Sequence, residues 1–248
     1  MLNIHRISKT FNAGTVNEKR ALSGLELHLQ EGDFVTVIGG NGAGKSTMLN
    51  AIAGTWFVDE GSILIDGIDV TRLPEHKRAA YLGRVFQDPM TGTAASMQIE
   101  ENLALASRRG KRRSLRIGIT AKERERYREQ LQILELGLEN RLTTGVGLLS
   151  GGQRQALTLL MATLRKPKLL LLDEHTAALD PKTAAKVLEA TDKIVGKDNL
   201  TTIMITHNMK QALELGNRTF LMADGNIVLD VGGEERSRLS VEDLLERF

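Results

Sequence analysis

The fold is decided by one stretch of sequence, Phe34-Val35-Thr36-Val37-Ile38-Gly39-Gly40-Asn41-Gly42-Ala43-Gly44-Lys45-Ser46. Its first five residues are apolar or β-branched, which predicts a buried strand. The last eight fit the pattern G-x-x-x-x-G-K-[ST], and a helix is expected from Lys45 to about Ala53, ended by Gly54. Glycines let successive backbone N–H groups converge on a phosphate, and the helix start adds partial positive charge. The stretch therefore predicts a strand, a phosphate-binding loop and a helix in succession.

The loop suits a nucleoside triphosphate with a metal ion. Lys45 can reach the β- and γ-phosphates, and the Ser46 hydroxyl can ligate Mg²⁺. A dinucleotide-binding loop would need a third glycine where Thr47 stands. The remaining alternative is an ordinary glycine-rich turn, which would not need a strand before it and a helix after it. The candidate phosphate contacts are Gly39, Asn41, Gly42, Ala43, Gly44, Lys45, Ser46 and Thr47.

Composition limits what the rest of the chain can do. The 248 residues predict one large domain or a core with an appended subdomain. The absence of cysteine excludes disulfides, thiol catalysis and thiolate metal sites. A net charge of +2 is too small to indicate a nucleic-acid partner. No apolar run approaches the ~18 residues of a membrane span, and the first residues lack the apolar core of a signal peptide. We therefore expect a soluble intracellular protein.

The wider pattern alternates short apolar strands with amphipathic helices, as in an α/β fold with a mostly parallel sheet. Residues 169–172 and 202–206 predict two further buried strands. Asp180 and Pro181 predict the start of a helix that runs to about Val195. Half-exposed antiparallel strands are expected where apolar and polar residues alternate, at 2–7, 22–29 and 62–70. Residues from about 90 to 165 are expected to be mainly helical.

Polar residues follow two of the predicted strands. Asp173 and Glu174 come directly after residues 169–172, and His207 ends the next strand. Carboxyl ends of parallel strands share one sheet edge, where ligands bind in open α/β folds. Asp173 there can help hold Mg²⁺, and Glu174 can polarise an attacking water as general base. The alternatives are a solvated loop start for the acidic pair and a capping or buried role for His207.

A second glycine cluster occurs at Leu149-Ser150-Gly151-Gly152-Gln153. Ser150 can cap a helix running to about Leu164, with Gln153 at the capping-box position. Two glycines in a first helical turn cost about 1 kcal/mol each relative to alanine. We therefore expect a ligand, such as a second set of phosphates, to approach this backbone closely.

These motifs together resemble the ATP-binding cassette (ABC) ATPases, the nucleotide-binding subunits of ABC transporters. The resemblance spans essentially the whole chain and keeps the family's order: the phosphate loop, Gln87 after a strand at 82–86, LSGGQ, the acidic strand end, Ala178-Leu179-Asp180, and His207. It implies a P-loop core with a mostly parallel sheet, an antiparallel β subdomain and an α-helical subdomain. The core would comprise residues 1–87 and 166–248, and the helical subdomain about 88–165.

The resemblance also implies a head-to-tail dimer that holds two ATP molecules with Mg²⁺. Ser150, Gly151 and Gly152, with Gln153 beside them, would contact the γ-phosphate bound by the other copy. Glu174 would activate water, His207 would contact the γ-phosphate, and Asp173, Ser46 and Gln87 would serve the metal. Asp180 would link the two sites, although it can equally be only a helix cap. Phe11 matches the aromatic that stacks on adenine, and the alternative is a core phenylalanine.

Two residues depart from the family's commonest pattern, namely His175, where proline usually follows the glutamate, and Gly40, where proline or serine is frequent. Neither removes a catalytic group. The expected protein is thus the ATPase subunit of a transporter, peripheral on the inner face of the cell membrane. Its partners would be a second copy, permease subunits and a separate substrate-binding protein, in an importer of a small solute such as an amino acid. The rival is a soluble ABC ATPase such as an iron–sulfur assembly ATPase.

A basic run lies inside the expected helical region, and its charges are Arg108, Arg109, Lys111, Arg112, Arg113 and Arg116. It is interpreted either as a solvated loop or as a site of attraction to anionic lipid head groups.

Overall fold

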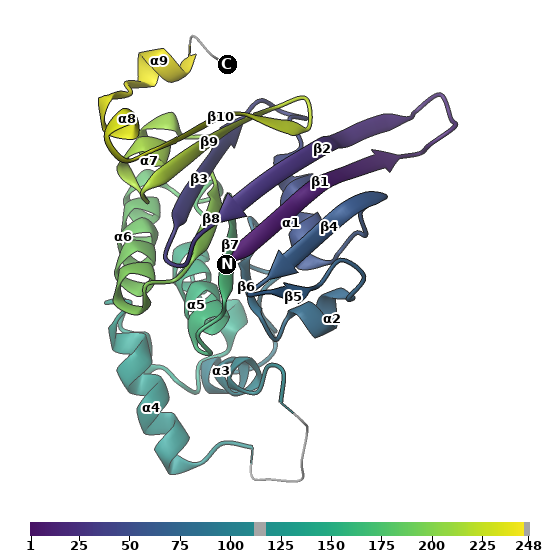
Figure 1. Ribbon diagram of the computed structural model, residues 1–248. Helices are drawn as coiled ribbons and strands as arrows, with labels where there is room; N and C mark the ends of the chain where they lie inside the picture. The colour runs from purple at the N-terminus through teal and green to yellow at the C-terminus, as the bar shows by residue number, and fades with distance from the viewer. Residues whose placement is uncertain (112–117, 246–248) are drawn as a thin grey trace.

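The computed structural model describes residues 1–111 and 118–245 (Figure 1). The strands are β1 (Leu2–Phe11), β2 (Lys19–Leu29), β3 (Phe34–Gly39), β4 (Glu60–Ile65), β5 (Ile68–Asp69), β6 (Leu82–Val85), β7 (Leu169–Asp173), β8 (Thr202–Ile205), β9 (Arg218–Ala223) and β10 (Asn226–Gly232). The α-helices are α1 (Lys45–Ala53), α2 (Glu75–Arg78), α3 (Ile99–Ser107), α4 (Ala121–Gln132), α5 (Gly151–Thr163), α6 (Pro181–Asp198), α7 (Met209–Glu214), α8 (Gly233–Arg238) and α9 (Val241–Leu245). Two 3-10 turns lie at Leu138–Asn140 and Val146–Leu148.

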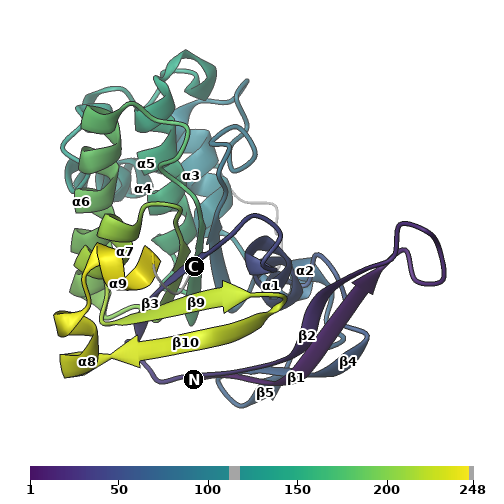
Figure 2. The same ribbon diagram turned by 90° about the horizontal axis from the view of Figure 1, so that it is seen from above.

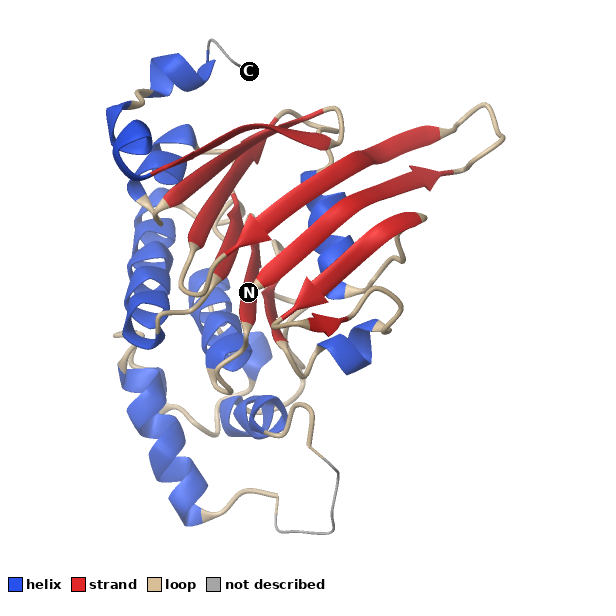
Figure 3. Cartoon of the chain, viewed as in Figure 1, coloured by secondary structure: helices blue, strands red, loops and turns tan. Residues whose placement is uncertain are grey.

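The strands form two sheets, which Figure 3 shows in red. The larger has the order β10-β9-β3-β8-β7-β6 and is parallel except for β10, which pairs antiparallel with β9. The smaller has the order β2-β1-β4-β5 and is antiparallel throughout. The predicted combination of a mostly parallel sheet, an antiparallel sheet and helices is therefore confirmed.

Helix α1 lies between the two sheets, as the view from above shows (Figure 2). One apolar cluster joins Met48, Leu49 and Ile52 of α1 to buried residues of both sheets. The first four residues of β7 are all leucine, because both faces of the strand are buried there. Leu169 and Leu171 pack in the cluster with α1, whereas Leu170 and Leu172 pack in a second cluster with α5 and α6.

The stretch from Phe34 to Ser46 forms the predicted strand, loop and helix. Helix α1 begins at Lys45 and ends at Ala53, and Gly54 closes it in the left-handed conformation with φ 83°. Gly44 has φ 100°, and a Cβ there would lie 2.6 Å from the carbonyl oxygen of Ala21 on β2. Glycine at this position is thus required by backbone conformation and by the close approach of β2.

Other boundaries differ from the sequence prediction in specific ways. Residues 62–70 were expected as one strand but form β4 and β5, because Asp66 and Gly67 make a two-residue turn with φ 52° and 77°. The β9–β10 hairpin, which turns at Asp224 and Gly225, was not predicted. Strand β1 extends beyond residue 7, β2 begins before residue 22, and α6 continues to Asp198.

The segment from residue 88 to 165 contains α3, α4 and α5, as expected. Its apolar cluster is continuous with the large sheet, because Val85, Leu170 and Leu172 belong to the same cluster as Leu103 and Leu159. The division into a core of residues 1–87 and 166–248 and a helical subdomain of about 88–165 stays a prediction. Among the described residues, no helix is long and apolar enough to cross a membrane.

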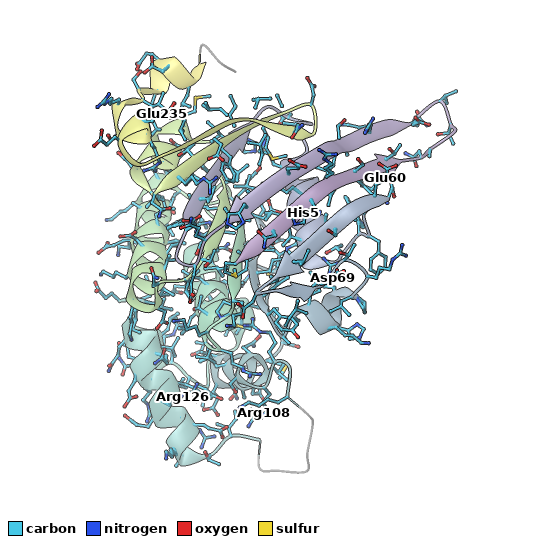
Figure 4. All side chains as sticks on the ribbon, in the orientation of Figure 1. His5, Glu60, Asp69, Arg108, Arg126 and Glu235 are labelled. Atoms are coloured by element: carbon cyan, nitrogen blue, oxygen red, sulfur yellow. The ribbon has the colours of Figure 1, made fainter. Side chains whose placement is uncertain are left out.

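Two arginines of the basic run serve the fold. Arg108, after α3 (Figure 4), donates to the carbonyl of Ala104 and pairs with Glu123 at 3.1 Å. Arg109 donates to the carbonyls of Ala162 and Arg165 at the end of α5. Both residues are therefore bonded within the chain, although Arg108 is also exposed to solvent, and the two interpretations of the run stay predictions. The positions 112, 113 and 116 lie outside the described residues.

Arg78 is a fully buried cation that ties α2 to the end of α1. It is 0% exposed, and its guanidinium donates to the carbonyls of Ala51 and Ile52 at 2.6 and 2.9 Å. It also donates to those of Leu73 and Thr71. Burial lowers the pKa of Arg78 to about 10, so it stays charged at neutral pH. A positive charge at these carbonyls also complements the partial negative charge of a helix C-terminus.

Replacing Arg78 with methionine should lower the free energy of unfolding by about 2–4 kcal/mol, because four buried carbonyls lose a charged donor. Urea unfolding followed by circular dichroism measures this. The exposed neighbour Lys77 provides the control, and Lys77→Met should stay within about 0.5 kcal/mol of the wild type. Equal effects of the two variants would contradict the anchoring role.

Candidate functional site

A cavity of about 170 Å³ lies where β3, β7 and β8 end, next to the start of α1. The parallel pairing of these strands brings their carboxyl ends to one edge, as predicted. The residues lining it are Lys19, Ala21, Asn41, Gly42, Ala43, Gly44, Lys45, Ser46, Thr47, Glu174 and His207. The phosphate loop, Glu174 and His207 are thus brought together by the fold.

Lys45 is buried under the loop that it belongs to. Its ammonium donates to the carbonyl oxygens of Gly39 and Gly40 at 2.6 and 3.0 Å. Burial lowers the pKa of Lys45, and the negative charges of Glu174 and Asp173 oppose that shift. The cation is therefore held between the loop and the acidic strand end, where a phosphate bound to the loop would meet it.

The carboxylates of Asp173 and Glu174 lie in different environments. Asp173 ends β7, and burial raises its pKa, while the nearby cation of Arg84 favours the charged form. Glu174 has φ 45°, an unusual conformation for a residue with a side chain, and its N–H donates to Ile205 at 3.1 Å. Oε1 of Glu174 lies 2.5 Å from Nε2 of His207. The turn after β7 therefore points the carboxylate toward the imidazole at the cavity.

Sequence reasoning missed two cations at this site. Lys19 lines the cavity from the start of β2. Arg84 of β6 places Nη2 3.8 Å from Oδ2 of Asp173 and 2.7 Å from Oδ1 of Asn50, and its Nη1 donates to Thr55 at 3.1 Å. Arg84 thereby connects the acidic strand end to α1. Neither Lys19 nor Arg84 belongs to a sequence motif. The place of each at the site depends on which strands are neighbours in space.

The LSGGQ segment forms the predicted helix start. The Ser150 hydroxyl accepts from the Gln153 N–H at 3.3 Å, and the Gln153 side chain accepts from the Ser150 N–H at 3.2 Å. None of residues 149–153 is among the described residues that line the cavity. Ser150 and Gly151 are exposed, so this helix start faces outward in the isolated chain.

A packing contact within the chain favours glycine at position 152. A Cβ on Gly152 would overlap the Cγ2 methyl of Thr183, in the first turn of α6. A Cβ on Gly151 would lie 3.5 Å from Leu179, which is an ordinary contact. The small size of Gly152 thus also lets α5 pack on α6, and the expectation that a ligand approaches both glycines stays a prediction. The same contacts place LSGGQ beside Ala178-Leu179-Asp180.

Gln87 and Asp180 are not among the described residues that line the cavity. Gln87 is exposed after β6, and the preceding carbonyl of Phe86 accepts from the buried Gln155 of α5 at 2.9 Å. Asp180 caps α6, and its side chain accepts from the Thr183 N–H at 3.1 Å. Its cap interpretation is thus confirmed by geometry, while a role across a dimer is not tested by a single chain.

Phe11 ends β1 and is partly exposed rather than buried in the core. Its ring contacts Trp56, with the ring centroids 4.6 Å apart and an angle of 76° between the planes. A role for Phe11 as a core residue is therefore not supported by its exposure.

His175, which stands where the family commonly has proline, is a buried anchor. It is 2% exposed, and its Nε2 lies 3.1 Å from the hydroxyl of Thr191 on α6. Burial lowers the pKa of His175 to about 4, so the ring is neutral at physiological pH. The substitution fixes the turn after Glu174 to α6 by a side-chain contact.

The strand, loop, helix and acidic sheet edge define the class of P-loop nucleotide-binding proteins. The sequence family described as ABC transporter matches residues 22–177. The chain therefore belongs to the ABC transporter family of ATP-binding proteins, and it is an ATPase.

Two relatives illustrate the match. The tyrosine transport ATP-binding protein of Clostridioides difficile (strain R20291) is 45% identical, with 100% of this chain and 98% of that protein covered. The methionine import ATP-binding protein MetN of Bartonella henselae is 34% identical over 92% of this chain. This chain spans 64% of the length of that protein.

Solved structures agree with the fold. A dimeric structure of the ATP-binding cassette MJ0796 in a post-hydrolysis state, bound to ADP and Pi, has a TM-score of 0.79 and 30% identity. The alignment covers 94% of this chain and 98% of that one. Another dimeric structure of the same bacterial ABC transporter cassette has a TM-score of 0.80 at 30% identity over the same shares.

The two glycines of LSGGQ should differ in what they contribute to stability. Gly152→Ala should lower the free energy of unfolding by about 1–3 kcal/mol, because the new methyl overlaps Thr183. Gly151→Ala, one position earlier, should stay within about 0.5 kcal/mol of the wild type. Thermal unfolding monitored by calorimetry distinguishes the two.

A second substitution identifies the contact. Thr183→Ser removes the overlapping methyl and keeps the hydroxyl, so it should restore most of the stability lost by Gly152→Ala. If the double variant is no more stable than Gly152→Ala, the packing explanation is wrong.

Proposed function

We propose that this chain is the ATP-hydrolysing subunit of an ABC importer, and that it works as a head-to-tail dimer around two ATP molecules. The observation that carries the proposal is the pairing of Glu174 with His207 at 2.5 Å, on the wall of the cavity formed by the phosphate loop. A carboxylate and an imidazole next to a phosphate site are the groups that hydrolysis requires.

The loop residues Gly39, Asn41, Gly42, Ala43, Gly44, Lys45, Ser46 and Thr47 are proposed to hold the triphosphate. Backbone N–H groups and the start of α1 supply the donors, and Lys45 supplies the positive charge. Phe11 is proposed to stack on the adenine. Its partial exposure and its position opposite Lys19, which lines the cavity, support this role.

The donor set suits Mg²⁺. Ser46 offers a hydroxyl, Asp173 a carboxylate and Gln87 an amide oxygen, all of them the hard oxygen ligands that this ion prefers. When bound, Mg²⁺ would neutralise the charge that develops on the β- and γ-phosphates. Arg84 keeps the Asp173 carboxylate turned toward α1 by an ion pair at 3.8 Å.

Glu174 is proposed to accept the proton of the attacking water. His207, whose Nε2 lies 2.5 Å from the Glu174 carboxylate, is proposed to contact the γ-phosphate. The turn that carries Glu174 is fixed on both sides, by the N–H bond to Ile205 and by the buried ring of His175. The base is therefore held in place before the water arrives.

A second copy is needed to complete this site. Ser150 and Gly151 are exposed and lie apart from the cavity of their own chain. Beside the capping box, the first-turn N–H groups of Gly151 and Gly152 have no acceptor within the helix and can face an anion. Gly152 and Gln153 shape the same helix start, and Asp180 lies on the adjoining segment. We propose that these residues meet the γ-phosphate held by the other copy.

The permease partner, the cargo and the location are proposed by analogy with the relatives. Relatives named for tyrosine transport and methionine import support an importer of an amino acid or a similar small solute. Membrane permease subunits and a separate binding protein are proposed as the other parts of such an importer. The chain would then lie on the inner face of the cell membrane. The same names do not favour a soluble ABC ATPase without a permease.

Glu174→Gln should bind ATP but hydrolyse it at least about 100-fold more slowly, because the amide cannot accept a proton. The ATP-bound dimer should then persist and elute as a dimer in size-exclusion chromatography, with phosphate release measured in parallel. Hydrolysis at the wild-type rate would show that Glu174 is not the base.

The dimer contact is tested in the same background. Glu174→Gln with Gly151→Asp places a carboxylate where the partner's γ-phosphate should sit, so ATP should bind with nearly unchanged affinity but no longer produce a dimer. Persistence of the dimer would reject the role of LSGGQ, and loss of both binding and dimer would indicate misfolding.

The transporter assignment predicts a membrane partner. Purification of the chain from its host in mild detergent should recover a protein with several membrane spans, and omission of detergent should lose it. Recovery of a set of soluble proteins in both preparations would support the rival ATPase instead.

A further inference from the structure

Trp56 lies against the proposed adenine-stacking residue and holds it from outside the known motifs. We propose that Trp56 is a positioning residue for the nucleobase, and that Phe11 and Trp56 together form an aromatic corner that takes a purine ring. This inference rests on the proposed function in one respect, namely that Phe11 receives the adenine.

The geometry of the aromatic corner supports this role. The ring centroids of Phe11 and Trp56 are 4.6 Å apart and the planes are inclined by 76°, an edge-to-face contact. Trp56 is 40% exposed and Phe11 is partly exposed, so both rings keep accessible surface. Two nearly perpendicular rings let a flat base stack on one of them while its edge contacts the other.

The segment that carries Trp56 is fastened to the end of β1. Oδ2 of Asp59 accepts from the Thr10 N–H and Oδ1 from Lys9 Nζ, both at 2.7 Å, while the Asp59 N–H donates to Ser8 at 2.9 Å. The Lys9 ammonium also lies 5.7 Å from the centroid of the Phe11 ring. These bonds fix the side chains around Phe11 before any nucleotide binds.

The next residue, Glu60, begins β4 and pairs with Ser8, and Figure 4 shows it beside the end of β1. The connection from α1 to β4 therefore passes the end of β1, from Phe11 to Ser8. The segment that carries Trp56 is thus bonded to α1 before it and to β1 after it.

The corner is linked to the phosphate cavity through Lys19. Phe11 pairs directly with Lys19 of β2, and residues directly opposite in an antiparallel pair extend to the same face of the sheet. Lys19 lines the cavity together with Gly42 and Glu174. The aromatic corner thus begins next to the wall of the triphosphate site, where the base of a bound nucleotide would emerge.

Trp56 is the single tryptophan among the 248 residues, so its fluorescence reports this site alone. Addition of ATP with Mg²⁺ to the intact protein should change the emission of Trp56. Inorganic triphosphate with Mg²⁺, which carries no base, should leave the emission unchanged. Equal changes with both compounds, or none with ATP at a concentration that saturates hydrolysis, would overturn the proposal.

Affinity measurements by calorimetry separate positioning from folding. Trp56→Leu should weaken ATP binding about threefold to tenfold and leave triphosphate binding unchanged, because only the base loses an aromatic neighbour. In steady-state assays KM should rise while kcat is retained. Trp56→Phe, which keeps a ring, should recover most of the affinity for ATP.

Phe57 is the matched control, since it is 50% exposed next to Trp56 and forms no aromatic pair among the described residues. Phe57→Leu should leave both affinities unchanged. If Phe11→Leu weakens ATP binding and Trp56→Leu does not, the inference about Trp56 is wrong and the adenine site stands. If neither weakens ATP binding, the adenine site itself is wrong. Equal loss of ATP and triphosphate binding in Trp56→Leu would indicate a general structural defect and reject the positioning role.

Discussion

The position of α1 between the two sheets is the constraint on which the site depends. The helix is packed on one side by the antiparallel sheet and on the other by β3, β7 and β8. Its start forms the phosphate loop, and its end is held by the buried guanidinium of Arg78. Because both ends are fixed, the loop keeps its place relative to the acidic ends of the strands, which come from distant parts of the sequence.

The sequence was sufficient to predict the residues whose local pattern determines their structure. The loop before Lys45, the cap at Ser150 and the cap at Asp180 each form as predicted, because capping and glycine conformations depend on a few consecutive residues. The edge that joins Glu174 and His207 was also predictable, since parallel strands align their carboxyl ends.

Contacts between distant elements were not predictable in the same way. Arg84 meets Asp173 only because β6 lies next to β7, and Gly152 must be small only because Thr183 of α6 approaches it. The two hairpins at Asp66-Gly67 and Asp224-Gly225 are a different case. Their Asp-Gly pairs are typical of two-residue turns, so local sequence alone is enough to predict both hairpins.

The packing of Gly152 on Thr183 has a consequence for how the proposed dimer would form. It joins the LSGGQ helix start to the segment that carries Asp180, so the two outward-facing motifs belong to one surface of the chain. Gln155 on the same helix holds the backbone just before Gln87. A phosphate that binds to Ser150 from another copy would therefore act on α5, and through α5 on the segment that carries Gln87. Because Gln87 is proposed to serve the metal of its own chain's site, this contiguous path would couple the two ATP sites of the proposed dimer without any long-range rearrangement of the large sheet.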